Sequence, residues 1–158
     1  MMSIQPKTLV RMKQLTKVES IVYLLGGITM VAGAGLYAFL LIQPIACWLM
    51  LVGAILFALM QSRQRYLGTA LAIRRLRKIM SLAGWGFILA GIFMVEDAYH
   101  FLRPIFTGSL DGYSSYVSIF HHNWVILLLI SAVIEMYTTH RISYELKRES
   151  KLTMNHVT

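Results

Sequence analysis

Four apolar runs dominate this sequence, and each is long enough to cross a lipid bilayer as a helix. They cover residues 21–42, 45–62, 79–96 and 116–139. About 20 mainly apolar residues in helical form span a bilayer core, where helices satisfy their own backbone polar groups. The pattern predicts an all-α, polytopic integral membrane protein: one domain over residues 1–158, folded as an antiparallel four-helix transmembrane bundle.

The composition agrees with this prediction. The chain is 57% hydrophobic and only 14% charged, whereas soluble domains are about half apolar and about a quarter charged. One small core cannot bury such an apolar surplus, so much of it is expected to face lipid. The single cysteine, Cys47, excludes an internal disulfide, a CxxC redox pair and a cysteine-rich metal cluster.

The basic residues predict how the chain is oriented. Of the 15 Lys and Arg residues, all but Arg103 precede the first run, lie between the second and third, or follow the fourth. The positive-inside rule then places both termini in the cytoplasm and residues 97–115 in an outer loop. We expect a bacterial inner membrane. A lipid bilayer, rather than nucleic acid, is the expected partner of the basic residues. The lipid-headgroup candidates are Arg74, Arg75, Arg77 and Lys78.

Two basic segments also carry helix signals. In residues 6–18, apolar side chains recur at three-residue spacing, which predicts an interfacial helix leading into the first span. Gly68 and Thr69 form a turn and cap signal before a helix that continues into the third span. The cytoplasmic connection is therefore expected to be two helix extensions joined near Gly68.

Small residues predict where the helices touch, because close approach favours them in lipid. The candidates are the pairs Thr29/Gly33, Ala34/Ala38 and Ala54/Ala58, and the stripe Ala83, Gly86 and Ala90. At about 100° per residue, the stripe continues to Asp97, with His100 about 60° beyond it. Asp97 is thus expected to face the bundle. Glu96 continues a different stripe, that of Trp85, Leu89 and Ile92.

Acidic and histidine side chains gather at the predicted outer boundary. Glu96, Asp97 and His100 close the third span, and His121 and His122 lie at the same depth in the fourth. Counting back from Glu135, we expect His121 to face the bundle and His122 to be interfacial.

Several interpretations of this group remain open. Asp97, His100 and His121, with Glu96 as a further ligand, suit a divalent metal such as zinc, iron or manganese. His100 and His121 are alternatively axial ligands of a haem. A proton- or ligand-binding role is a third reading. The simplest reading is that helices end here, with Arg103 paired to Glu96 or Asp97.

A second group of polar side chains, one of them an acid that is unfavourable to place in a membrane, lies near the predicted inner boundary. Glu135 sits about one turn inside it, and Ser131 falls on the same stripe about 40° away. An acid at the membrane centre costs about 3 kcal/mol, and less near the edge. Glu135 is expected either to pair with a basic residue or to serve as a proton relay or substrate contact. The expected basic partners are Lys17, Arg63 and Arg65.

These features predict an accessory or structural subunit of a membrane complex, associated with itself or with other membrane proteins. A metal- or haem-binding enzyme or redox protein is the second class. A small carrier or channel, indicated only by Glu135 and the Gly-rich first span, is the third. The sequence contains no Gly-rich phosphate loop and no GxSxG elbow, so whether the chain is an enzyme stays open.

Overall fold

The computed structural model describes residues 12–13, 15–66 and 70–155, and it is built almost wholly of helices. The helices are α1 (Lys17–Ala38), α2 (Gln43–Arg63), α3 (Leu71–Tyr99), α4 (Arg103–Phe106), α5 (Leu110–Phe120) and α6 (Asn123–Asn155). Four segments are long and apolar enough to cross a membrane: α1, α2, α3 and Leu110–Leu152. The prediction of an all-helical fold with four candidate spans is confirmed.

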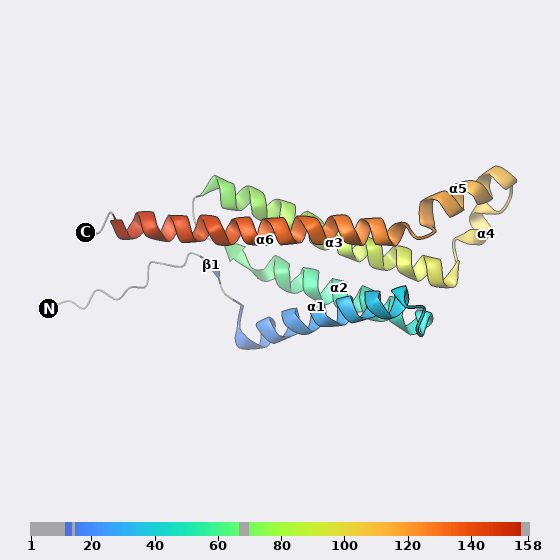
Figure 1. Ribbon diagram of the computed structural model, residues 1–158, viewed down its shortest axis with the longest axis horizontal. Coiled ribbons are helices and arrows are strands. Elements are labelled where there is room, and N and C mark those ends of the chain that lie inside the picture. Colours follow the sequence, from blue (N-terminus) through green and yellow to red (C-terminus); the bar gives the residue numbers. More distant parts are fainter. Residues whose placement is uncertain (1–11, 14, 67–69, 156–158) are drawn as a thin grey trace.

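The long helices pack in the order α1, α2, α3, α6 (Figure 1). Helices α1 and α6 meet where the rings of Tyr37 and Trp124 stack edge to face, with centroids 5.3 Å apart. Beyond that contact, an open groove of about 600 Å³ is lined by both helices. We call it the α1–α6 groove. The end of the molecule that holds α4 and α5 is the α4–α5 end, and the opposite end, where α6 finishes, is the basic end.

Glycines bring the backbones of α1 and α2 into direct contact. A Cβ on Gly33 would overlap the backbone nitrogen of Met50, and one on Gly53 would overlap that of Met30. Gly33 was predicted to lie at a helix contact, and it does. Its predicted companion Thr29 instead donates its hydroxyl hydrogen to the Leu25 carbonyl of its own helix, at 2.7 Å.

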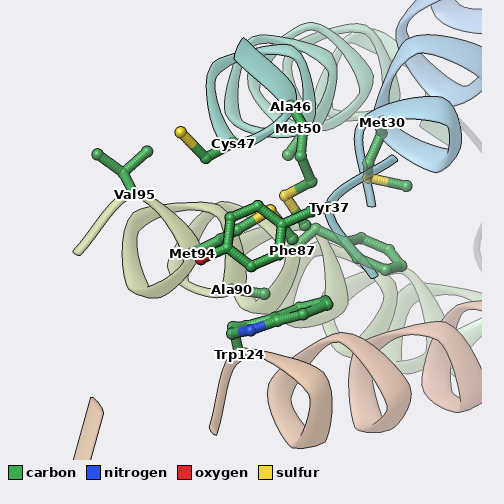
Figure 2. Packing of buried hydrophobic residues seen from close by; sticks show 11 residues of the cluster. Met30, Tyr37, Ala46, Cys47, Met50, Phe87, Ala90, Met94, Val95 and Trp124 are labelled. Carbon is green, nitrogen blue, oxygen red and sulfur yellow. The ribbon is translucent and has the colours of Figure 1, made fainter. Parts of the chain in front are cut away.

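The main core lies where α2 and α3 face each other (Figure 2). Methionine and small side chains fill the space between the ribbons, with Tyr37 and Trp124 closing one side. Ala83 and Ala90 are buried, as their stripe predicted. Gly86 packs so closely on α6 that a Cβ there would meet the Ser131 hydroxyl.

The link between α1 and α2 differs from the prediction. Helix α1 ends at Ala38 rather than at Ile42. Leu40 and Ile42 have φ values of 59° and 47°, so the chain reverses through left-handed residues. Pro44 lies in the first turn of α2, a position that tolerates a missing N–H. Residues 39–42, not Gln43 and Pro44, therefore break the apolar run.

The predicted fourth span, residues 116–139, is not one continuous helix. Helix α5 ends at Phe120, His122 has a φ of 58°, and α6 begins at Asn123. The Asn123 amide donates to the Ser118 and Ile119 carbonyls at 2.7 and 2.8 Å, which satisfies groups left open at the end of α5. The predicted outer loop, residues 97–115, is likewise largely helical, because it holds the end of α3, α4 and the first half of α5.

The basic end contains a short β pairing. Strand β1 (Met12–Lys13) pairs antiparallel with β2 (Arg65–Tyr66). Thr16 and Glu19 form a reciprocal capping box that starts α1 at Lys17. The prediction of a helix over residues 6–18 is therefore wrong at Met12 and Lys13, and its residues 6–11 and 14 lie outside the described chain.

The predicted helix extensions between the second and third spans are half correct. Helix α3 begins at Leu71, so the third span does extend into the basic segment. Helix α2 ends at Arg63, and β2 follows it where a helix was expected. The predicted turn at Gly68 and Thr69 falls outside the described residues.

Candidate functional site

Glu96 anchors the segments that follow α3. Its side chain is only 1% exposed. Its carboxylate accepts the Leu102 backbone N–H at 3.0 and 3.2 Å and the Tyr116 hydroxyl at 2.8 Å. Trp85, Leu89 and Ile92, on the stripe to which Glu96 was assigned, are exposed. Glu96 is nevertheless buried, because the chain beyond α3 folds back and covers it.

His100 belongs to the same hydrogen-bonded network. It ends α3 in a left-handed conformation, with φ 54°. Its Nδ1 lies 3.2 Å from the Tyr116 hydroxyl oxygen. Since that hydroxyl donates its hydrogen to Glu96, His100 Nδ1 must be the donor to Tyr116. His100 is therefore part of a series of hydrogen bonds that runs from its ring through the Tyr116 hydroxyl to Glu96.

Asp97 faces the interior, as predicted. Its side chain is 9% exposed, and its Oδ2 accepts the Tyr37 hydroxyl at 3.0 Å. Its other oxygen, Oδ1, lies 3.3 Å from His121 Nδ1. Asp97, directly after the third predicted span, and His121, in the fourth, thus do meet.

His122, which is exposed, lies beside this pair. The rings of His121 and His122 are 3.7 Å apart between centroids and nearly perpendicular, at 81°. Asp97, His121 and His122 each offer a ligand atom within 4.8 Å of the others. We call these three residues the Asp97–His121–His122 cluster. Of the four predicted metal ligands, Asp97 and His121 lie in it, whereas Glu96 and His100 bond to Tyr116.

A cavity of about 230 Å³ adjoins the cluster. It is lined by Asp97, His100, Arg103, Tyr113, Tyr116, Val117, Phe120 and His121. The Arg103 guanidinium lies 5.5 Å from the centre of the Tyr113 ring, so a cation–π contact forms at the cavity wall. The volume is below the roughly 300–1,000 Å³ of pockets for drug-sized ligands. It therefore suits an ion or a very small molecule better than a porphyrin.

A second polar site lies toward the basic end. The Gln61 amide donates to Glu135 Oε1, and the Arg77 guanidinium donates to the Gln61 carbonyl at 3.4 Å and to Gln64 Oε1 at 3.3 Å. Gln61 is therefore a hydrogen-bonding partner of Glu135, whereas the side chain of Arg65, one of the expected basic partners, lies outside the described part of the structure. Arg63, one of those expected, pairs with Glu19 at 3.7 Å.

The second oxygen of Glu135 accepts no well-formed hydrogen bond within the described chain. Oε2 is buried, and Thr139 is the nearby side chain that interacts with the carboxyl group. Glu135 lines the α1–α6 groove together with Tyr23, Met30, Phe57, Phe87, Ala132, Met136, Thr139, His140 and Ser143. A half-satisfied carboxyl group therefore lies at a mainly apolar groove between two of the candidate spans.

The remaining predicted residues differ in how exposed their side chains are. Ser131 is buried against Gly86, as a small helix contact requires. Arg74, Arg75 and Lys78 are exposed on the first turns of α3, where headgroups would reach them. Arg77 turns inward to the end of α2 instead.

Three residues of these sites were not predicted. Tyr37 and Tyr116 lie near predicted span ends, where aromatic residues are typical of membrane interfaces, so nothing indicated a hydrogen bond to a carboxylate. Gln61 lies near the basic end of α2, and a polar side chain at the depth of Glu135 was the available signal.

Comparison with known proteins yields no relative: no family model, no curated protein and no solved structure matches this chain. The proposals below therefore depend on the residues and contacts described above.

Proposed function

We propose that this chain is a multi-pass protein of a bacterial inner membrane, with both termini in the cytoplasm, that acts as an accessory or structural subunit. It associates with a transmembrane helix of another membrane protein, or of a second copy of itself, through the α1–α6 groove. The class is supported by four helices long and apolar enough to span a membrane.

The distribution of charge supports the orientation. The basic residues between α2 and α3 and those in the second half of α6 share the basic end, whereas Arg103 is alone at the α4–α5 end. Lysine and arginine are retained preferentially on the cytoplasmic side of a membrane. This orientation puts the Asp97–His121–His122 cluster outside the cytoplasm.

The buried second oxygen of Glu135 is the observation that carries the proposed association. A buried carboxyl oxygen without a well-formed hydrogen bond costs free energy, and lipid chains offer no donor. A helix that entered the α1–α6 groove with a hydroxyl, amide or ammonium group would supply one. Aromatic and methionine side chains along the groove would pack on the apolar part of that helix.

Site-directed photocrosslinking tests the association. In a Cys47→Ala background, benzophenone is attached at Met136→Cys, which lines the groove, and at Tyr137→Cys, which does not. The two positions are adjacent and similarly exposed, at 71% and 61%. In native membranes, we expect a higher-mass adduct from Met136→Cys and little from Tyr137→Cys. Adding Glu135→Ala should lower the yield about 3- to 20-fold, the effect of losing a hydrogen bond worth about 0.6–1.7 kcal/mol in a membrane.

Two results would contradict this proposal. One is equal crosslinking at both positions, which would indicate random encounters in the membrane. The other is a chain that remains monomeric both in native membranes and on sizing in mild detergent. Mass spectrometry of the adduct distinguishes a second copy, which gives twice the mass of the chain, from a different protein.

A further inference from the structure

We propose that the Asp97–His121–His122 cluster is a binding site for a divalent transition-metal ion, and that Zn²⁺ is the ion its ligands fit best. The inference does not depend on the proposed association, because the cluster lies at the α4–α5 end and the Glu135 groove lies toward the basic end.

The spacing of the ligand atoms suits a metal. Zinc binds imidazole nitrogen and carboxylate oxygen at about 2.0–2.2 Å in tetrahedral geometry, which places neighbouring ligand atoms ~3.4 Å apart. Asp97 Oδ1 and His121 Nδ1 are already 3.3 Å apart. All three ligand atoms lie within 4.8 Å of one another, and the rings of His121 and His122 are both exposed, so they have room to turn toward a bound ion.

The ligand types favour zinc over harder ions. Two imidazoles with one carboxylate are typical of zinc and non-haem iron sites, whereas magnesium and calcium prefer oxygen ligands alone. The single cysteine, Cys47 on α2, is buried and donates its thiol hydrogen to the Pro44 carbonyl, so it is not among the three residues of the cluster. One carboxylate and two neutral imidazoles leave a bound divalent ion with a net charge of +1.

Asp97 is held in place before any ion binds. The Tyr37 hydroxyl donates to Oδ2 at 3.0 Å, which leaves Oδ1 directed at His121. Metal ligands usually have such a supporting hydrogen bond, and removing it typically weakens metal binding about 10- to 100-fold. Since Tyr37 comes from α1 and Asp97 from α3, the packing of the long helices fixes the carboxylate.

The backbone at the two histidines is also arranged in an unusual way. His121 is extended, with φ −68° and ψ 117°, and His122 is left-handed, with φ 58°. A left-handed residue other than glycine costs of order 1–3 kcal/mol and is often found at functional sites. The conformation brings two consecutive imidazoles together above Asp97.

A simple ion pair accounts for only part of this arrangement. It would explain the distance from Asp97 to His121, but not why the His122 ring lies against the His121 ring. Three protein ligands also leave the fourth position of a tetrahedral ion open for water or a small anion. The adjoining cavity, with Arg103 in its wall, provides the space.

Direct binding measurements test the site. The full chain, purified without a polyhistidine tag and stripped with a chelator, is titrated with Zn²⁺ against a fluorescent chelator, and with Co²⁺ in the visible range. We expect one ion per chain and tetrahedral Co²⁺ absorption. X-ray absorption should show nitrogen and oxygen ligands only. Asp97→Asn, His121→Ala and His122→Asn should each weaken zinc binding by at least ~100-fold, since each removes a direct ligand.

Matched variants separate binding from folding. Tyr37→Phe should weaken binding about 10-fold or more. His100→Ala, which changes a histidine of the same cavity outside the cluster, should change it less than about 2-fold. His122→Asn and His122→Gly suit the left-handed backbone, so they should keep the thermal stability of the metal-free chain while losing the metal.

The proposal is overturned if the triple variant of the three ligand residues binds zinc as tightly as the native chain. A zinc–sulfur signal, or equal weakening by His100→Ala, would also overturn it. If Asp97 and His121 form only an ion pair, their variants will lower stability without changing zinc affinity, and that result rejects the site as well.

Discussion

Glu96 and Asp97 are adjacent carboxylates at the end of α3, yet they bond to different parts of the molecule. Glu96 bonds within its own end of the chain, to the Leu102 backbone and the Tyr116 hydroxyl. Asp97 bonds to α1 through Tyr37 and to the segment before α6 through His121. Successive helix residues point about 100° apart, so one turn of α3 serves both a fold anchor and a candidate metal site.

Replacing Glu96 with Ala should loosen the α4–α5 end. The change leaves the Leu102 N–H and the Tyr116 hydroxyl without their acceptor, which should lower the free energy of unfolding by about 1–3 kcal/mol. Hydrogen exchange in micelles should show faster exchange in α4 and α5 but little change in α2. Asp111→Asn, an exposed change in the first turn of α5, is the control and should have an effect within about 0.5 kcal/mol.

A double-mutant cycle identifies the contact itself. If Glu96 acts through Tyr116, the effects of Glu96→Ala and Tyr116→Phe will be less than additive, because both remove the same hydrogen bond. Strictly additive effects would mean that the two residues stabilise the α4–α5 end independently.

At the scale of helices, the α1–α2 hairpin depends on glycine where the two backbones touch. Gly33→Ala would force its new Cβ against the Met50 backbone, and such overpacking typically costs about 1–3 kcal/mol. Gly35→Ala, two residues along the same helix, meets no atom within 4 Å and should gain up to about 1 kcal/mol from helix propensity. Thermal or denaturant unfolding in micelles measures both. Equal losses would show that the close contact is unimportant.

The sequence predicts helices better than it predicts their ends. The favourable transfer free energies of about 20 apolar residues add up in each run, so the sequence predicts each of these helices strongly. The breaks at Leu40, Ile42 and His122 use left-handed residues that are not glycine. The usual signal for such a conformation is therefore missing. For this reason the first span was predicted to end at Ile42 although α1 ends at Ala38, and the fourth span was predicted to be continuous.

Prediction of the candidate sites was limited in the same way, because side-chain orientation can be counted only along an unbroken helix. Counting around α3 from its small residues correctly turned Asp97 inward, because both lie on one unbroken helix. Counting from Glu135 to the histidines passed through the break at His122, so the predicted difference between His121 and His122 had no basis. The burial of Glu96 was not predicted, because residues beyond the helix cover it and a helical wheel contains no information about them.

For the molecule as a whole, the proposed orientation in the membrane decides which molecules each candidate site can bind. Gly108 lies exposed between α4 and α5, with open space where a Cβ would be. In a Cys47→Ala background, Gly108→Cys should react with a membrane-impermeant maleimide in intact cells. Lys151→Cys, exposed near the end of α6, should react only after the membrane is opened. The reverse pattern would place the basic end outside and contradict the positive-inside assignment.

Tyr37 connects the two candidate sites through the contacts of α1. Its hydroxyl bonds to Asp97, its ring packs on Trp124, and its helix, α1, forms one wall of the groove that contains Glu135. If a ligand bound Asp97 more tightly in one position of α1 than in another, its binding would favour that position of the groove wall. By thermodynamic reciprocity, a helix seated in the groove would change the affinity for the ligand by the same factor. Tyr37→Phe would then uncouple two binding events while leaving the groove itself unchanged.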